Sequence, residues 1–363
     1  MDILHSPFAG SDNAKFRQSF QSTIRERLQR ALKLIDMYSA VINDGTLESE
    51  LQSIADNKYQ LEEIRETATL AKVRIGKNEL SDSDTDILLS LAHLVSFGNE
   101  GKDEHEQWNE PHYYSSVFID EVQDFTEVQV FLMAEQANPK RRAVTAVGDF
   151  RQQLKYGTVA NIGRCFPRAS AEDIKPIFLS ENKRQSQALV YFSSRFRTDI
   201  LGDRIEDFKS PEYPDNIECL SLWKIGKEKI DECIKNIILA TSDNFSLAVI
   251  CPSKSVAKWL EEKLHDELGA YYRETQVSEK RDLCRPYYIH FTTALDVKGL
   301  EFDSVVVALF DQFDLSDSIQ ANSAYVAVTR PKKELHIIGE ECLSSGPFAK
   351  FIVPEFKARI RSL

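Results

Sequence analysis

Two hydrophobic patterns divide the chain. Between residues 12 and 75, apolar side chains recur at three- and four-residue spacing, which is the period of an amphipathic helix. A second helical stretch, with apolar positions from Ile87 to Val95, follows Ser81-Asp82-Ser83-Asp84, a cluster of residues that often cap helices. We expect the first helix to pack on its own domain, and a partner-binding face is the alternative. The sequence therefore predicts an N-terminal helical segment.

After residue 112, short apolar runs typical of buried strands alternate with helical segments. The predicted strands are Val117–Ile119, Ala143–Val147, Ile177–Leu179, Leu247–Cys251, Tyr287–Phe291, Val305–Leu309 and Leu335–Ile338. Helices are predicted between several of them, notably at Gln185–Arg197 and Ser255–Leu268. Such alternation is typical of parallel sheets that are covered by helices on both faces. The predicted fold class is therefore α/β.

Length and composition set the broad class. A chain of 363 residues can form two domains, and Phe166-Pro167 to Lys175-Pro176 is a suitable boundary. Hydrophobic residues make up 42% and charged residues 28%, as in ordinary soluble proteins. Six scattered cysteines without a C-x-x-C pair argue against a zinc or iron–sulfur site and against a disulfide framework. This usage and the lack of a membrane-length apolar run predict a cytoplasmic protein without membrane contact.

The net charge of −12 argues against a protein that coats DNA tightly. It is compatible with a translocating enzyme, whose basic groove is local. Basic clusters occur at Arg25–Arg30, Lys140-Arg141-Arg142 and Arg330–Lys333. For the first two, a solvated face and a binding surface are both open interpretations.

The strongest chemical signal is the pair Asp120-Glu121 directly after the predicted strand Val117–Ile119. The carboxyl end of a strand is where open α/β sheets place ligand chemistry. One carboxylate can hold Mg²⁺, and its neighbour can orient or deprotonate a water for attack on a γ-phosphate. Four polar segments follow in order: Val147–Gln153, Leu179–Arg184, Thr293–Phe302 and Ala324–Arg330.

In order, spacing and flanking strands, these segments resemble the UvrD/Rep-like superfamily 1 DNA helicases, from roughly Ser81 to the C-terminus. In that family two RecA-like domains clamp ATP between them, and single-stranded DNA runs across their tops. The resemblance implies RecA-like parallel sheets of the P-loop NTPase type, with one domain incomplete. It divides the chain into a helical remnant of subdomain 1B (1–112), a partial first RecA-like domain (113–170) and a second RecA-like domain (171–363).

The resemblance also implies catalytic roles. Asp120 would hold Mg²⁺ and Glu121 would activate the attacking water. Gln152 would sense the γ-phosphate. Arg184 and Arg330 would act as arginine fingers, which neutralise charge that develops during phosphoryl transfer.

Further residues would bind the nucleotide or the nucleic acid. Glu301 and Gln123 would belong to the nucleotide site, and Asp149 would link that site to the DNA side. Thr293 would lie near the DNA backbone, and Tyr156 is what remains of a stacking segment. The implied ligands are ATP, Mg²⁺ and single-stranded DNA or a single/double-strand junction.

The sequence departs from this family in one decisive motif. No G-x-x-x-x-G-K-[ST] phosphate loop occurs, and Gly98–Asp103 approaches it with the wrong spacing. Leu295 also stands where many relatives have His. Without the loop, Asp120 and Glu121 are expected to lack a compensating cation. We therefore predict that the chain alone binds ATP weakly or not at all and does not hydrolyse it.

The missing loop also removes a strand beside Ala143–Val147. An uncovered edge promotes aggregation, so we expect an N-terminal segment of the chain, a second protein or a second copy of the chain to cover it. Two interpretations of function stay open. One is an ATP-dependent helicase or translocase that acts only when complemented, and the retained acidic and arginine residues favour it. The other is an inactive helicase-like scaffold or DNA sensor in genome maintenance or phage defence.

Overall fold

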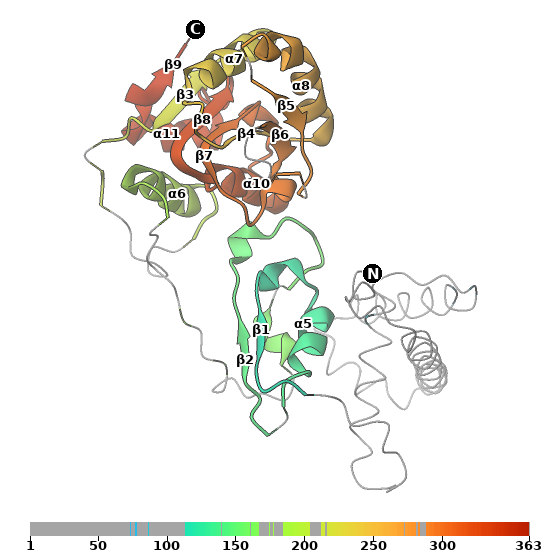
Figure 1. Ribbon diagram of the computed structural model, residues 1–363. Helices are drawn as coiled ribbons and strands as arrows, with labels where there is room; N and C mark the ends of the chain where they lie inside the picture. The colour runs from blue at the N-terminus through green and yellow to red at the C-terminus, as the bar shows by residue number, and fades with distance from the viewer. Residues whose placement is uncertain are drawn as a thin grey trace, which may run out of the picture. The chain divides into compact units, whose positions relative to one another are not determined.

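The computed structural model describes most of residues 113–362 (Figure 1). The described residues are 113–138, 140–159, 161–166, 184–203, 212–214, 216–271, 273–280, 282–283 and 288–362, with 73, 77, 86, 174 and 177. The helices predicted between 12 and 95 and most of the strand predicted at Ile177–Leu179 lie outside them. The chain forms two compact units, one of residues 1–120, 125–147 and 161–169, the other of 121–124, 148–160 and 170–363. The domain boundaries at 112 and 170 stay predictions.

The first unit contains a parallel pair of strands, β1 (Val117–Ile119) and β2 (Val144–Ala146), in the register Val117↔Val144 to Ile119↔Ala146. Both were predicted from their apolar runs. The helix α5 (Glu127–Ala134) begins at a capping box, in which the Thr126 and Gln129 side chains each accept a hydrogen bond from the other's backbone N–H. The short helix η4 (Ile162–Cys165) contacts α5. Among the described residues, β1 is the one strand that pairs with β2.

The second unit contains a seven-stranded, fully parallel sheet in the order β5-β6-β4-β7-β8-β3-β9. The strands are β3 (Leu220–Lys224), β4 (Leu247–Cys251), β5 (Thr275–Val277), β6 (Ile289–Thr293), β7 (Phe302–Val307), β8 (Pro331–Gly339) and β9 (Ile360–Arg361). The predicted α/β class with RecA-like parallel sheets is confirmed. The strand predicted at Tyr287–Phe291 instead occupies Ile289–Thr293, and that at Val305–Leu309 occupies Phe302–Val307.

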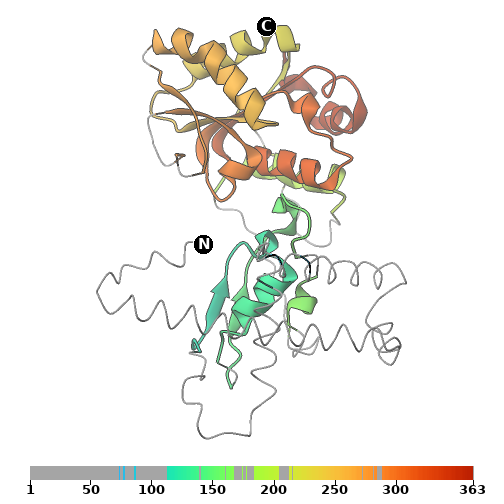
Figure 2. The same cartoon turned by 90° about the vertical axis from the view of Figure 1, so that its right-hand side faces the viewer.

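Helices cover both faces of this sheet (Figures 1 and 2). On one face lie α6 (Gln187–Asp199), α10 (Ser318–Val328) and α11 (Gly346–Glu355), and on the other α7 (Ile230–Ala240) and α8 (Lys254–Gly269). The unit also contains α9 (Ala294–Val297) and the shorter η2 (Val122–Asp124), η3 (Phe150–Gln152), η6 (Lys227–Lys229), η7 (Phe310–Gln312) and η8 (Lys357–Arg359).

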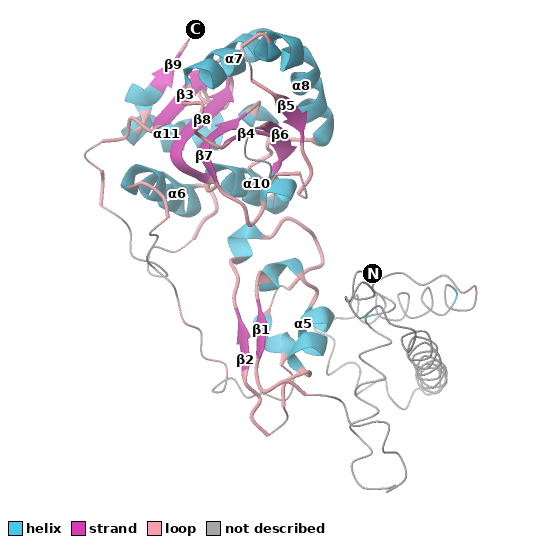
Figure 3. Ribbon diagram, in the orientation of Figure 1, coloured by secondary structure: helices cyan, strands magenta, loops and turns pink. Residues whose placement is uncertain are grey.

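Successive residues of each strand point to opposite faces, so the sheet separates two hydrophobic cores. Along β4, Ala248 and Ile250 enter the core that contains α6, α10 and α11, whereas Leu247 and Val249 enter the core that contains α7 and α8. Figure 3 shows this sheet in magenta with its helices in cyan. Of the helices that the structure describes, none combines the length and apolar character needed to cross a membrane.

Candidate functional site

The chain turns sharply after β1. Asp120 follows the strand directly and is exposed, at the end of the first unit. Glu121 begins the segment that belongs to the second unit, and its φ is 51°. A left-handed conformation is unfavourable for a residue with a Cβ, by about 1 kcal/mol or more, and such strain concentrates at functional sites. The turn is closed by the Asp124 N–H, which donates to the Glu121 carbonyl (2.8 Å).

Gln123 is a buried amide that fixes the Glu121 carboxylate. Its exposed fraction is 0%, and its Nε2 donates to Glu121 Oε2 (2.6 Å) while its Oε1 accepts from the Asp149 N–H (3.1 Å). Gly148 makes room for this amide, because a Cβ at that position would lie 2.2 Å from Gln123 Oε1. Gln123 therefore holds Glu121 against the start of the loop after β2.

A chain of hydrogen bonds continues from Asp149 to Arg330. Asp149 caps η3 by accepting from the Arg151 N–H (3.0 Å), and its second oxygen accepts from Gln152 Nε2 (3.1 Å). Gln152 Oε1 in turn accepts from Arg330 Nη2 (3.1 Å). Within the second unit, the structure thus brings together the predicted residues Glu121, Gln123, Asp149, Gln152 and Arg330.

Arg330 is 2% exposed and is held by backbone and side-chain acceptors. It donates to the carbonyls of Val326 (3.0 Å) and Leu300 (3.3 Å) and to Thr329 Oγ1 (3.0 Å). Burial and, to a smaller extent, the positive charge of Arg184 lower the pKa of Arg330 to about 10, against the opposing effect of Tyr325, Glu121 and Glu301. Arg330 is therefore still a cation at neutral pH.

Parallel strand pairing places Glu301 next to Arg330. The register of β7 and β8 aligns Phe302 with Pro331, so the residues just before each strand meet at the amino edge of the sheet. Glu301 there pairs with Arg184 (2.9 Å) and Lys332 (3.2 Å). The predicted residues Arg184, Glu301 and Arg330 thus form one charged cluster.

Lys298 is a site residue that the sequence reasoning missed. It is 5% exposed, and its Nζ bonds to Asp124 and lies 3.6 Å from Glu121 Oε2. The expectation that Glu121 lacks a compensating cation is therefore wrong. The available signal was a lysine between the apolar residues Val297 and Leu300, in a segment already assigned to the site.

The two residues predicted to contact nucleic acid lie elsewhere in the second unit. Thr293, at the carboxyl end of β6, donates to Asp296 (2.7 Å). Tyr156 is 73% exposed and donates to Asp317 Oδ2 (2.6 Å), the N-cap of α10, and this bond raises the pKa of the phenol. In the described part of the chain, neither side chain is hydrogen-bonded to Glu121, Gln123, Asp149, Gln152 or Arg330.

The carboxylates after β1 are suited to a Mg²⁺ ion that is held jointly by protein carboxylates and nucleotide phosphates. Among the described residues, no cluster of three or more His, Cys, Asp or Glu side chains can hold a metal by itself. Mg²⁺ does not require one, because it commonly binds through one or two carboxylates together with nucleotide phosphates and water. The Lys298 ammonium beside Glu121 and Asp124 shows that this corner of the site accepts positive charge.

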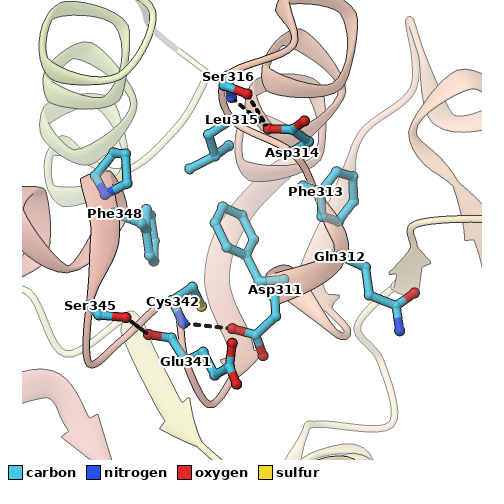
Figure 4. A pocket seen from close by; sticks show the side chains of 12 residues that line it. Asp311, Gln312, Phe313, Asp314, Leu315, Ser316, Glu341, Cys342, Ser345 and Phe348 are labelled. Atoms are coloured by element: carbon cyan, nitrogen blue, oxygen red, sulfur yellow. Dashed lines mark hydrogen bonds between the residues drawn. The ribbon is translucent and has the colours of Figure 1, made fainter.

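A surface cavity of about 430 Å³ lies beyond the carboxyl ends of β7 and β8, opposite the ends where Glu301 and Arg330 meet (Figure 4). Its apolar wall includes Phe310, Phe313 and Phe348, and its acidic side chains are Asp311, Asp314 and Glu341. Asp311 bridges the two loops by accepting from the N–H groups of Glu340 (2.8 Å) and Cys342 (2.6 Å). Three carboxylates repel phosphate, so this cavity is unsuited to the nucleotide.

Comparison with known proteins gives a family for this chain. A family model described as the viral superfamily 1 RNA helicase core domain matches residues 100–339, which is more than half of the chain. The chain belongs to this superfamily 1 helicase family. No curated protein matches the sequence. Among solved structures, the C-terminal domain of a possible DNA helicase from Lactobacillus plantarum WCFS1 is similar, with a TM-score of 0.34 and 16% identity, over 50% of this chain and 99% of that one.

Proposed function

We propose that this chain is part of an ATP-driven translocase of the UvrD/Rep-like type, which moves along single-stranded nucleic acid. The observation that carries the proposal is the continuous hydrogen-bond chain from Glu121 to Arg330. It joins Glu121, which follows β1, to Gln152, which follows β2, and to Arg330, which precedes β8. A scaffold without nucleotide chemistry has no need for a buried arginine to be tied to a carboxylate in this way.

Each side chain in this chain has a task that phosphoryl transfer requires. Glu121, oriented by Gln123, is the base that positions or deprotonates the attacking water. Gln152 senses the terminal phosphate in this proposal, and its hydrogen bond with Arg330 would report the presence of that phosphate to the arginine. Arg330 and Arg184 neutralise charge that develops on the phosphoryl group.

The remaining predicted residues complete the nucleotide site. Asp120 is the proposed Mg²⁺ ligand, and the metal when bound would neutralise phosphate charge. Glu301 contacts the nucleotide from the edge where β7 begins. Thr293 and the exposed ring of Tyr156 contact the nucleic acid, the ring by stacking on a base.

Turnover requires a phosphate loop from outside these 363 residues, which contain no G-x-x-x-x-G-K-[ST] sequence. That loop supplies backbone N–H groups and a lysine that grip the β- and γ-phosphates. We propose that a protein partner provides it and pairs with β2. The family model is described for RNA helicases, whereas the motif pattern resembles DNA helicases, so both nucleic acids belong in the test.

The test is ATP hydrolysis by native complexes captured on the tagged chain. Complexes are isolated from the host extract with wild-type chain and with Glu121→Gln as bait, and hydrolysis is measured with and without poly(dT) or poly(U). Lys258→Ala, which removes an exposed charge on α8, is the matched control. We expect nucleic-acid-stimulated hydrolysis with the wild type and the control, and its loss with Glu121→Gln. Equal hydrolysis with all three baits would refute the proposal.

A further inference from the structure

The turn between α5 and β2 carries three consecutive exposed cations, Lys140, Arg141 and Arg142. Its backbone is fixed by Asn138. The Asn138 side chain accepts from the Lys140 N–H (2.9 Å), and its carbonyl accepts from the N–H groups of Arg141 (3.0 Å) and Arg142 (2.7 Å). The three charges therefore project from a defined turn of the first unit.

The backbone at Arg142 is unfavourable for an arginine. Its φ is 45°, in the left-handed region that glycine adopts without cost and asparagine tolerates. An arginine at this position costs about 1 kcal/mol relative to glycine, so a change to glycine removes the charge without adding backbone strain.

Among the residues that the structure describes, no acidic side chain forms an ion pair with Lys140, Arg141 or Arg142. Elsewhere exposed lysines do find acidic partners, such as Lys254 with Glu279 (3.1 Å) and Lys263 with Asp231 (2.7 Å). In a chain with a net charge of −12, three adjacent cations without such a partner in the described part form a local positive surface.

An exposed aromatic residue lies beside this surface. Tyr114 is 64% exposed, and its backbone is bound to the segment that begins the turn. Its N–H donates to the Gln136 carbonyl (2.8 Å), and its carbonyl accepts from the Asn138 N–H (2.8 Å). Cations that track a phosphate backbone, combined with an aromatic ring that stacks on a base, are how proteins bind single-stranded nucleic acid.

We propose that Tyr114, Lys140, Arg141 and Arg142 form a second contact for single-stranded nucleic acid. It lies at the amino ends of β1 and β2, whereas Asp120 follows the carboxyl end of β1 (Figure 3). The aromatic ring and the helicase family favour nucleic acid over an acidic protein segment. The contact rests on nucleic-acid binding by this family and does not require ATP hydrolysis.

The experiment measures binding of the full chain to fluorescein-labelled dT20 and rU20 by anisotropy over a range of KCl concentrations. Arg142→Gly removes one charge and relieves the backbone strain, so it is expected to unfold no more easily than the wild type. Each phosphate contact to a single strand contributes about 0.7 to the slope of log K against log salt, so Arg142→Gly should weaken binding about fivefold at 0.1 M KCl. The variant Lys140→Ala/Arg141→Ala/Arg142→Gly should reduce the slope by about 2.

Two further variants test specificity. Tyr114→Ala should lower affinity about fivefold or more, as loss of a stacked base does, with little change in the salt slope. Lys258→Ala/Lys350→Ala/Lys357→Ala removes the same charge from exposed positions of α8, α11 and η8 and should keep the wild-type slope.

The contact is refuted if the turn variants keep the wild-type affinity and slope, or if the control variant loses as much as they do. Either result leaves the proposed nucleotide chemistry untouched, because this assay contains no ATP. Loss of hydrolysis in Glu121→Gln with unchanged binding here would in turn bear on the nucleotide site alone.

Discussion

Replacing Gly148 with alanine is expected to break the buried contact between Gln123 and the loop after β2. The new Cβ would lie 2.2 Å from Gln123 Oε1 and 2.8 Å from Val122 Cγ1. Real Cβ atoms do not approach oxygen this closely, so the Gln123 amide must move. Because Gln123 is fully buried, its amide has no solvent to bond to after it moves.

The expected loss of stability follows from the two hydrogen bonds of that amide. The bond from the Asp149 N–H (3.1 Å) is between neutral groups and contributes about 1 kcal/mol. The bond to Glu121 (2.6 Å) is charge-assisted, but the carboxylate is 41% exposed, so we take a value near the lower end, about 1.5 kcal/mol. Gly148→Ala should therefore lower the free energy of unfolding by about 2–3 kcal/mol.

Urea denaturation followed by circular dichroism measures this loss, with Gly269→Ala as control. A Cβ at Gly269 meets nothing within 4 Å at the end of α8, so that change should be neutral or slightly stabilising. The double variant Gly148→Ala/Gln123→Ala separates the mechanism from general crowding, because the clash with the amide is then absent. It should be about 1–2 kcal/mol more stable than the sum of the single losses predicts. Additive losses would contradict the role given to Gln123.

Three other changes test the energetics of the second unit by the same denaturation assay. Arg330→Ala should cost about 3 kcal/mol or more, because it removes the donor to Gln152 Oε1 and to the Leu300 carbonyl and one of the donors to the Val326 carbonyl, and Arg330→Lys should recover only part. Phe192→Ala should cost about 3–5 kcal/mol, since the ring is fully buried between Phe351 and Phe356. Burial acts to raise the pKa of Asp303, but bonds from Lys333 and Ser246 outweigh it and lower that pKa. Asp303→Asn should therefore lose about 1 kcal/mol at pH 7. Its difference from the wild type should begin to shrink as the pH falls below about 4, where the aspartate of the unfolded chain becomes protonated, and should disappear below the lowered pKa of the folded carboxyl.

The sequence predicted best the elements whose residues are all buried, because their apolar run coincides with the element. β4 occupies the predicted Leu247–Cys251. All five of its residues are buried, so the ends of the apolar run coincide with the ends of the strand. The apolar run Val305–Leu309 gave the wrong end for β7, because burial does not stop where the strand stops. Leu309 is buried but has a φ of 49°, so the strand ends at Val307 and the apolar character continues into a turn.

Other elements carry too little local signal to be predicted. β5 and β9 have three and two residues and lie at the two edges of the sheet, so neighbouring strands determine them rather than their own periodicity. β3 was missed because Ser221 interrupts its apolar run, although that serine is 3% exposed. Short or interrupted strands depend on tertiary pairing, which a single sequence does not display.

For the candidate site, too, the sequence indicated some features and the structure supplied others. Glu301 and Arg330 were named through the resemblance, and the β7–β8 register brings the residues just before these two strands together. Gln123 was named only through the resemblance, and its complete burial and its contact with Gly148 depend on tertiary packing. Residue types and order named the candidate side chains. They did not predict which of them are buried.

Lys298 changes how the acidic end of the site is understood. Its ammonium is buried and needs acceptors, whereas its partners Asp124 and Glu121 are about 40% exposed and can be solvated by water. The ion pairs therefore stabilise the buried ammonium of Lys298 more than they stabilise the two carboxylates. Lys298 contacts Asp124 more closely than Glu121, so Asp124 alone can keep the lysine paired when Glu121 turns toward another ligand. For the same reason Glu121→Gln leaves Lys298 with an anionic partner, and a loss of hydrolysis in that variant would report on the carboxylate's chemistry rather than on unfolding.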